Sequence, residues 1–304
     1  MEKTGVLTLI EVKKINQKRV YEFLYRQKTA SKLEIANAIN VSLPTVASSL
    51  NALIAQGLVS NCGVYDSTGG RKAQIFCCNA LARIAIGVEL LKERVQIVAV
   101  DLYGNTLDED FLELGFENEA SYYSKLGEWI NQFVKALPYT DEQNLGVCIS
   151  LQGLISDDGE TITYSEILKC TGVSRSTYQK YIDYPVSLVH DTEAAAQAEV
   201  WYRDDITDDA VYIALNRNLG GTLILGNRSD TFKRNGLIEH ITLDPDGPLC
   251  YCGKQGCAET FCSANSLKEK AGMEFPEFFK KVHGGDSRCS KLWKSYLHYL
   301  ARLI

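Results

Sequence analysis

The chain has 304 residues, of which 45% are hydrophobic and 23% are charged, a balance typical of soluble globular proteins. No apolar run approaches the ~20 residues of a membrane span, and the N-terminus lacks the long apolar core and cleavage site of a signal peptide. We therefore expect a cytoplasmic protein that does not enter a membrane. Its ten cysteines would then mostly stay reduced, which argues against a disulfide framework.

The net charge of −6 is unevenly distributed along the chain. Residues 1–80 hold ten Lys and Arg against five Asp and Glu, whereas residues 81–304 hold 22 against 33. A basic segment on an acidic body indicates that the first part contacts nucleic acid and the second does not. Charge alone is a modest argument, because small domains also differ in charge by chance.

The N-terminal segment predicts three helices. Residues 15–28, "INQKRVYEFLYRQK", place apolar side chains at helical spacing. In "SKLEIANAIN", Ser31 and Glu34 have the spacing of a capping box. After the turn "NVS", Ser42 is placed to cap a third helix, "LPTVASSLNALIAQ", which Gly57 would end in a left-handed conformation. Two short helices around a tight turn, with small polar residues on the outer side of the second, predict a helix-turn-helix.

The next segment, "LVSNCGVYDSTGGRKAQIFCC", has two apolar runs around a turn rich in Gly, Ser and Asp, which predicts a β-hairpin of the wing type. Two cations near its tip can reach phosphates or a narrow minor groove. The third helix carries no Arg or Lys on its first turns, so reading of bases there depends on hydroxyls, apolar contacts and DNA shape. A scaffold that mediates only protein contacts is the alternative. The candidate DNA-binding residues are Ser42, Pro44, Thr45, Ser48, Ser49, Gly70, Arg71 and Lys72.

From residue 81 onward, strands and helices interleave, which predicts an α/β body. Successive strands joined by tight turns are expected over residues 83–114, where "DLYGN" is one turn, and a helix over residues 119–137. The segment "VSLVHDTEAAAQAEVWYR" predicts a strand that ends at His190 and Asp191 and passes into an Ala-rich helix. The segment "AVYIALNRNLGGTLILG" predicts a hairpin with glycines in its turn.

Three cysteines fall within the eight residues "CYCGKQGC", and a histidine lies ten residues before the first of them. Zinc takes four nitrogen or sulfur ligands in a tetrahedron, and structural sites are closed. Gly253 and Gly256 would let the loop fold back so that its sulfurs face one another. This spacing predicts a structural zinc site without an open position for a catalytic water; a redox pair and uncoordinated thiols are the alternatives. The candidate metal ligands are His240, Cys250, Cys252 and Cys257.

The order of these features, including "STGGRKAQIF", "DLYGN", "HDTEAAAQAE" and the His…Cys-x-Cys-Gly-x-x-Gly-Cys-x-Glu run, resembles the transcriptional repressors of the ROK family (repressors, open reading frames and sugar kinases), of the N-acetylglucosamine and xylose repressor type. The resemblance covers nearly the whole chain and implies the same four zinc ligands. It implies a winged helix-turn-helix DNA-binding domain over residues 1–80 and an actin-like, RNase H-like body of sugar-kinase type over residues 81–304. Family members continue beyond the helix predicted near residue 304, so we expect the second lobe of this body to be incomplete.

Sugar kinases of this family hold ATP phosphates on a glycine-rich hairpin, which the resemblance places at residues 89–93, Glu-Leu-Leu-Lys-Glu. No glycine remains there. Phosphates need a close approach of backbone N–H groups, which glycine permits most easily, and the two carboxylates would repel phosphate. We therefore expect neither ATP binding nor enzymatic activity.

The resemblance also implies sugar contacts. Asp191 corresponds to the family's catalytic base and, without ATP, would accept a hydrogen bond from a sugar hydroxyl; the role of a helix N-cap is the alternative. The family's Asn is His190 here, its Glu before the zinc histidine is Leu237, and Glu239 replaces a glycine. His190 and Glu239 could make substitute contacts or be satisfied within the protein. The candidate effector-binding residues are Gly153, His190, Asp191, His240 and Glu259.

These observations predict a DNA-binding transcriptional regulator of the repressor type, which binds a double-stranded DNA operator as a homodimer or homotetramer. Its body would bind a sugar or a related effector without phosphorylating it. Two alternatives stay open. One is a sugar kinase that has acquired a winged helix, and the other is an effector-independent regulator or assembly protein.

Overall fold

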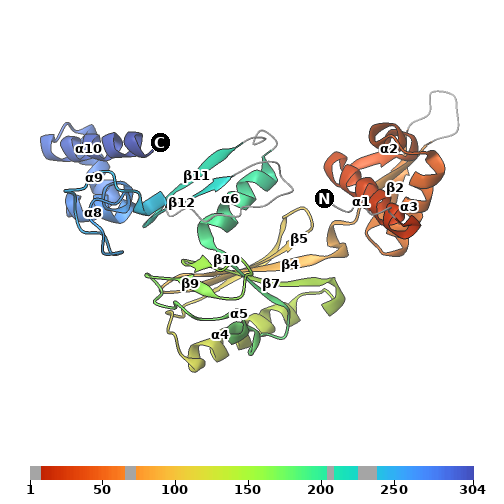
Figure 1. Cartoon of the computed structure of the whole chain (residues 1–304), viewed down its shortest axis with the longest axis horizontal. Helices are drawn as coiled ribbons and strands as arrows, with labels where there is room; N and C mark the ends of the chain where they lie inside the picture. The colour runs from red at the N-terminus through yellow and green to blue at the C-terminus, as the bar shows by residue number, and fades with distance from the viewer. Residues whose placement is uncertain (1–7, 66–72, 204–208, 225–237) are drawn as a thin grey trace, which may run out of the picture. The chain divides into compact units, whose positions relative to one another are not determined.

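The computed structural model describes residues 8–65, 73–203, 209–224 and 238–304, and Figure 1 shows their elements. The chain divides into two compact units. The second unit comprises residues 86–98, 108–138 and 146–304. The first unit comprises residues up to Ala85 together with two short later segments, 99–107 and 139–145.

The N-terminal part of the first unit combines three helices with a small sheet. Its elements are α1 (Leu9–Gln27), β1 (Thr29–Ser31), α2 (Lys32–Ile39), α3 (Leu43–Ala55), β2 (Val59–Val64) and β3 (Gln74–Cys78). The strand order is β1-β3-β2, and β3 is antiparallel to both neighbours. The chain bends by 115° between α2 and α3, within the range of helix-turn-helix motifs. The predicted winged helix-turn-helix is therefore confirmed.

Local signals in the sequence set the ends of these helices. Ser31 and Glu34 form the predicted capping box, in which Glu34 Oε2 accepts the Ser31 N–H at 2.7 Å. Gly57, with a φ of +71°, follows the end of α3, and the N–H of Leu58 donates to the carbonyl of Leu53 at 3.0 Å. This bond across a left-handed glycine is the mark of a Schellman cap.

The apolar side chains of these helices form one core with the sheet. Leu24, Ile35, Leu50 and Phe76, one each from α1, α2, α3 and β3, are buried in it. Among the described residues, no single helix has the length and apolar content needed to cross a membrane. By length and composition alone, α2 and α3 pass that test as a bent pair.

A five-stranded sheet forms the centre of the α/β body. Its strands are β4 (Ile84–Leu90), β5 (Val95–Asp101), β6 (Thr106–Leu112), β7 (Asn144–Leu151) and β10 (Val186–His190), in the order β10-β7-β4-β5-β6. The edge strand β10 runs parallel to β7. Two helices, α4 (Ala120–Ala136) and α5 (Arg175–Gln179), lie on one side of the sheet (Figure 1). A two-stranded ribbon, β8 (Leu154–Ile155) with β9 (Ile162–Tyr164), follows β7.

The "DLYGN" turn between β5 and β6 belongs to the first unit, where it packs on α1. The ring of Tyr103 stacks on that of Tyr25 with centroids 4.7 Å apart, and Lys28 Nζ lies 3.5 Å from the centroid of Tyr103. The Tyr25 hydroxyl donates to the carbonyl of Leu102 at 2.7 Å. Asp101 shapes the turn by accepting the N–H of Tyr103 at 2.8 Å. Within the first unit, this turn is thus fixed to α1 by aromatic stacking and a hydrogen bond.

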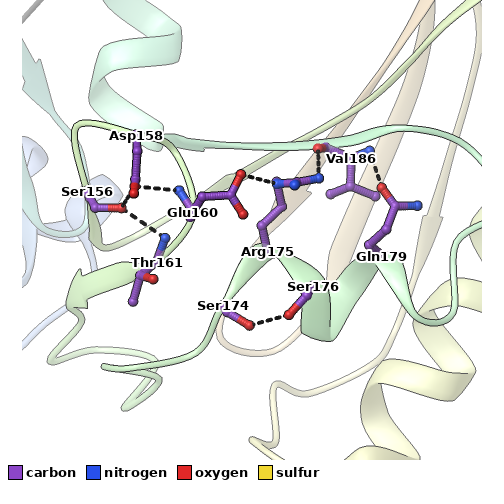
Figure 2. A network of polar contacts seen from close by, with 9 residues as sticks. All are labelled: Ser156, Asp158, Glu160, Thr161, Ser174, Arg175, Ser176, Gln179 and Val186. Atoms are coloured by element: carbon purple, nitrogen blue, oxygen red, sulfur yellow. Dashed lines mark hydrogen bonds and ion pairs between the residues drawn. The ribbon is translucent and has the colours of Figure 1, made fainter.

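A polar network anchors the start of β10 (Figure 2). Arg175 of α5 donates from Nε to Glu160 at 2.9 Å and from a terminal nitrogen to the carbonyl of Val186 at 3.4 Å. Gln179 accepts the N–H of Val186 at 2.9 Å. Because β10 is an edge strand, these side chains supply partners that a neighbouring strand would otherwise provide. The strand that carries His190 at its far end is thereby held in place.

A helix follows β10 directly and packs on a hairpin. The elements are α6 (Asp191–Tyr202), β11 (Ala210–Leu215) and β12 (Leu219–Ile224). The prediction of glycines in the hairpin turn is wrong, because the turn is residues 216–218 and the glycines lie in β12. A Cβ on Gly220 would lie 2.3 Å from Thr192 Cγ2, and one on Gly221 would lie 2.7 Å from the carbonyl oxygen of Tyr212. At Gly220, the missing side chain makes room for α6.

The C-terminal part of the second unit is helical, and the long helix predicted there is present. Its elements are η3 (Ile238–His240), α7 (Glu259–Cys262), α8 (Ala264–Ala271), α9 (Phe275–His283) and α10 (Ser287–Leu303). Phe261 stacks on Tyr299 of α10 with ring centroids 3.9 Å apart, and the Tyr296 hydroxyl donates to the carbonyl of Cys262 at 3.0 Å. These contacts fix α10 against α7, which follows the cysteine-rich loop.

Candidate functional site

Four of the eight predicted DNA-contacting residues lie on the outer side of α3 or at its N-cap. Ser42, Pro44 and Ser48 are exposed, and Thr45 is half-buried. Ser42 Oγ lies 2.8 Å from Thr45 Oγ1 and also accepts the Thr45 N–H, so Ser42 caps α3 as predicted. The predicted wing residues lie outside the described residues; they are Gly70, Arg71 and Lys72.

The placement of Ser49 on this surface is wrong. Its side chain is only 2% exposed, because it falls in the same helical stripe as Val46, Leu50 and Leu53, which face the core. Sequence reasoning missed Asn51, which is exposed one turn after Ser48. Its i+3 spacing from Ser48 was the available signal, and an Asn amide can pair with the edge of adenine.

The four predicted metal ligands come together in the second unit. The ligand atoms of His240, Cys250, Cys252 and Cys257 all lie within 4.8 Å of one another. Cys250 Sγ is 3.6 Å from His240 Nδ1, and Cys252 Sγ is 3.7 Å from Cys257 Sγ. The histidine ends η3, and the cysteines come from the loop before α7.

Two glycines let this loop fold back on itself. Gly253 has a φ of +86° and Gly256 a φ of +69°, a region in which glycine is strongly favoured. A Cβ on Gly256 would lie 1.5 Å from the carbonyl oxygen of Asp244. The N–H of Cys250 donates to the carbonyl of Lys254 at 2.8 Å across the turn. Backbone geometry, rather than long side chains, therefore brings the sulfurs together.

The donor set and its spacing fit a zinc ion. A tetrahedron with Zn–S bonds of ~2.3 Å has ligand–ligand edges of about 3.8 Å, close to the 3.6 and 3.7 Å that separate the two pairs of donors. Burial lowers the pKa of His240, which favours the neutral imidazole that a metal requires. Burial raises the pKa of the Cys250 thiol to about 12, so a nearby cation is needed for that thiol to lose its proton at neutral pH.

A cavity of about 1230 Å³ lies beside the cysteine-rich loop in the second unit. Its wall comes from the β4–β5 turn, the segment after β7, the β10–α6 junction, the β11–β12 turn and η3. Four of the five predicted effector-binding residues line it, namely Gly153, His190, Asp191 and His240. Such a volume accommodates a small ligand with room to spare.

Glu259 is not part of this wall, which corrects its predicted effector contact. Its Oε2 accepts the N–H of Leu219 at 2.6 Å, and its Oε1 accepts the amide of Asn218 at 2.9 Å. The carboxylate is 5% exposed and holds the β11–β12 turn. Its interaction is therefore internal to the protein.

His190, Asp191 and Thr192 form a buried network at the start of α6. Asp191 Oδ1 accepts the N–H of Thr192 at 2.7 Å and lies 3.2 Å from His190 Nε2, while His190 Nδ1 is 2.8 Å from Thr192 Oγ1. Burial lowers the pKa of His190 to about 4 and raises that of Asp191 to about 6. At neutral pH these shifts leave His190 neutral and Asp191 mostly ionised. The N-cap position belongs to His190 and not to Asp191, which is the first residue of α6.

Glu239 differs from Glu259 and Asp191 in its hydrogen bonding. It lines the cavity, its side chain is 7% exposed, and its Oε2 has no hydrogen-bond partner in the part of the chain that the structure describes. Burial, followed by smaller repulsion from Asp191 and Glu259, raises its pKa to about 7. The sequence marks this position only as a departure from the family's glycine.

The β4–β5 turn enters the cavity with side chains in place of a glycine loop. The N–H of Leu91 donates to the carbonyl of Arg94 at 3.0 Å, which closes the turn. Glu93 and Arg217 form a distant pair at 3.9 Å, with both side chains at least 80% exposed. Burial raises the pKa of Glu89 at the end of β4, and repulsion from Asp191 adds to this.

Two family models match the chain. One, described as "Winged helix-turn-helix DNA-binding", covers residues 14–60, and the other, described as "ROK family", covers residues 85–304. The chain belongs to the ROK family. The sequence resemblance is thereby confirmed, and this ROK protein carries the expected winged helix at its N-terminus.

Curated relatives of this ROK protein are named as repressors. It is 25% identical over 299 residues to the "Xylose repressor" of Bacillus subtilis, covering 95% of this chain and 77% of that protein. It is 24% identical over 264 residues to the "DNA-binding transcriptional dual regulator NagC" of Escherichia coli, covering 85% of this chain and 65% of that protein. The chain thus spans about two thirds to three quarters of the length of these relatives.

Solved structures show the same fold. A ROK family transcriptional regulator described as a homologue of the E. coli MLC protein matches with a TM-score of 0.78 and 20% identity, covering 96% of this chain and 79% of that one. A ROK family glucokinase from Streptomyces griseus matches with a TM-score of 0.58 and 21% identity, covering 71% of this chain and 76% of that one. The predicted fold, a winged helix-turn-helix followed by a body of sugar-kinase type, is confirmed.

Proposed function

We propose that this protein is a DNA-binding transcriptional regulator of the repressor type. The observation that carries the proposal is the exposed outer side of α3 on a basic winged helix, joined to a ROK body whose nucleotide turn has lost its glycines. Ser48 and Asn51 of α3 would face base edges, and Ser42 and Thr45 would contact the backbone at the start of the helix. Relatives over nearly the same span are named as repressors.

The body would act as an effector sensor. A sugar or a related small molecule would occupy the cavity beside His240 and Asp191 and shift the protein between two arrangements that bind DNA differently. Such a shift requires that the ligand bind the two arrangements with different affinity.

Zinc would be structural in this protein. His240, Cys250, Cys252 and Cys257 would hold the ion, which would fix the loop beside the cavity and the orientation of the His240 ring. With four protein ligands the site would have no open position for a catalytic water. We infer no kinase activity, because Leu91, Lys92 and Glu93 occupy the turn where close backbone contact with phosphates is needed.

A homodimer or homotetramer would bind a two-fold symmetric operator, because paired recognition helices read half-sites one helical turn apart. Selection of bound duplexes from random oligonucleotides tests the whole proposal. We expect enrichment of a site with two related halves and an affinity that falls steeply with salt. Recovery of no enriched duplex, or binding that does not change with salt, would contradict it.

Asn51 provides a sharper test of the α3 surface. Asn51→Ala should weaken binding to the selected operator by about 1–3 kcal/mol and relax the preference at one base pair. Gln56→Ala is a suitable control, because Gln56 is exposed at the far end of the same helix. Equal losses in the two variants would show that α3 does not read bases through Asn51.

A further inference from the structure

The cavity wall contains one carboxylate that the protein itself leaves unsatisfied. Glu239 is more than nine-tenths buried, lines the cavity, and has an Oε2 without a hydrogen-bond partner among the described residues. A buried carboxylate without a partner costs several kcal/mol unless a cation or hydrogen-bond donors reach it. The position of Glu239 in the wall means that a ligand can supply that partner.

Neighbouring groups add negative charge to this part of the cavity. Asp191, in the same wall, lies 3.2 Å from a neutral His190 and accepts the N–H of Thr192, and neither contact brings a positive charge. No Lys or Arg of the described residues forms an ion pair with Glu239 or Asp191. A zinc ion in the adjacent loop would not compensate either, because three thiolates more than balance its two charges.

Within the described part of the chain, five cations line the cavity, and three of them form ion pairs with carboxylates other than Glu239, while Lys92 and Arg94 lie in the β4–β5 turn. Lys169 pairs with Glu166, Arg217 with Glu93, and Lys268 with Glu274. None of the ion pairs among the described residues involves Glu239, whose nearest charged neighbours include the carboxylates of Asp191 and Glu259. A neutral ligand would not relieve that charge, whereas an ammonium group would.

Two aromatic rings lie in the same wall. Tyr164 and Tyr251 both line the cavity, and the ring of Tyr251 packs edge-on against His240 with centroids 5.1 Å apart. Aromatic faces attract ammonium groups and also pack against the C–H faces of sugar rings. Carboxylates and aromatic rings together are the usual surroundings of a bound amine.

We propose that the cavity binds a polyhydroxylated small molecule that carries a cationic amine, in the manner of an unacylated amino sugar. Its ammonium group donates to Glu239, and a hydroxyl group donates to the free oxygen of Asp191. This proposal rests on the effector role of the cavity proposed above and names the chemical class of the effector. It separates amines from neutral sugars of the same ring, because a hydroxyl can donate a hydrogen bond to Glu239 but only the ammonium group also neutralises its charge.

Calorimetric titration of the metal-loaded full chain tests the proposal. The probes are D-glucosamine, D-galactosamine and D-mannosamine, each compared with its neutral parent hexose and its N-acetyl derivative. At least one free amine should bind at least about 30-fold more tightly than both neutral counterparts, as expected for a buried charge pair. Tighter binding of a neutral sugar, or no binding of any amine at millimolar concentration, would overturn it.

Variants of two wall carboxylates complete the test. Glu239→Gln should weaken amine binding at least about 30-fold and leave neutral sugars unaffected, and Glu239→Asp should recover part of the loss. Glu166→Gln is the matched control, because Glu166 lines the same cavity but already pairs with Lys169; it should change the affinity less than about threefold. Unchanged metal content and circular dichroism establish that each variant is folded, and an unchanged amine affinity in Glu239→Gln would refute the proposal.

The operator experiment separates this proposal from the function on which it rests. If the protein binds an operator in a salt-dependent way but binds none of the amines, only the proposed ligand class is rejected. If the protein binds an amine but the selection recovers no operator, the regulatory function is rejected and the proposed ligand class is retained.

Discussion

The cysteine-rich loop and the β4–β5 turn lie in the same unit and border the same cavity, yet they differ in what their residues do. In the loop, four donors converge within 4.8 Å, and Gly256 sits where a Cβ would lie 1.5 Å from a carbonyl oxygen. In the turn, Leu91, Lys92 and Glu93 line the cavity with bulky side chains, and the ion pair that Glu93 forms with Arg217 is long and exposed. One segment is tightly constrained, and the other is an ordinary turn.

This difference teaches which part of a kinase-like body the protein still depends on. A phosphate loop needs open backbone N–H groups, and bulky side chains there cost nothing once nucleotide is no longer bound. A metal loop needs its donors in one place, and every ligand matters to the fold. The predictions below test whether the contrast holds, beginning with the largest expected effect.

Cys257→Ser should abolish metal binding and lower the free energy of unfolding of the second unit by at least about 3 kcal/mol, because the loop then loses the ion that joins its donors. Metal content by mass spectrometry and urea unfolding measure the two effects. Cys148→Ser is the control, because Cys148 is exposed in β7 and far from the cluster in sequence. A wild-type protein that purifies without metal from zinc-supplemented medium would remove the basis of the contrast.

Glu259→Gln should destabilise the second unit by about 1–3 kcal/mol, because Gln directs at most one acceptor at the N–H of Leu219 and the amide of Asn218. Urea unfolding checks this value. Glu269→Gln, an exposed change on α8, should have little effect. Similar stabilities of the two variants would mean that Glu259 does not hold the β11–β12 turn.

Asp191→Asn should stabilise the protein above pH 6, by up to about 2 kcal/mol. Burial raises the pKa of Asp191 from an ordinary 3.8 to about 6, so folding favours the protonated acid. The native state therefore loses stability as the pH rises through 6, and Asn avoids that loss. The difference between variant and wild type should shrink as the pH falls below about 6 and disappear near about pH 3, where the acid is protonated in both states. Unfolding curves at a series of pH values give this difference, and a gap that does not change with pH would contradict the assignment.

Glu93→Ala should have the smallest effect, a change in stability below about 0.5 kcal/mol, because an exposed pair at 3.9 Å contributes little. Thermal unfolding of wild type and variant is sufficient to check it. A larger loss would show that the β4–β5 turn is under structural constraint after all and would weaken its contrast with the loop.

The sequence predicted those features whose cause is local. The capping box of Ser31 and Glu34, the left-handed Gly57 and the folded-back cysteine loop all depend on residues a few positions apart. The ROK resemblance rested on the order of such local motifs. The spacing of the cysteines was enough to place their sulfurs together, because two glycines constrain so short a loop.

Other features could not be predicted, because residues distant in sequence decide them. Ser49 is buried because α3 turns that stripe toward the core, and Gly220 of β12 is needed because α6 packs on it. Helical periodicity shows that a helix has two sides, but the packing of the other elements decides which residues at the margin are covered.

By itself the sequence determined the winged helix, the kinase-type body and the convergence of His240 with three cysteines, since each follows from short-range spacing and residue chemistry. Only the tertiary structure decided that Glu259 turns inward to hold the β11–β12 turn while Glu239 is buried in the cavity wall without a partner. The physical reason is that the partners of a buried carboxylate are set by the elements that the fold brings around it. For Glu259 these elements lie 40 residues away in the chain.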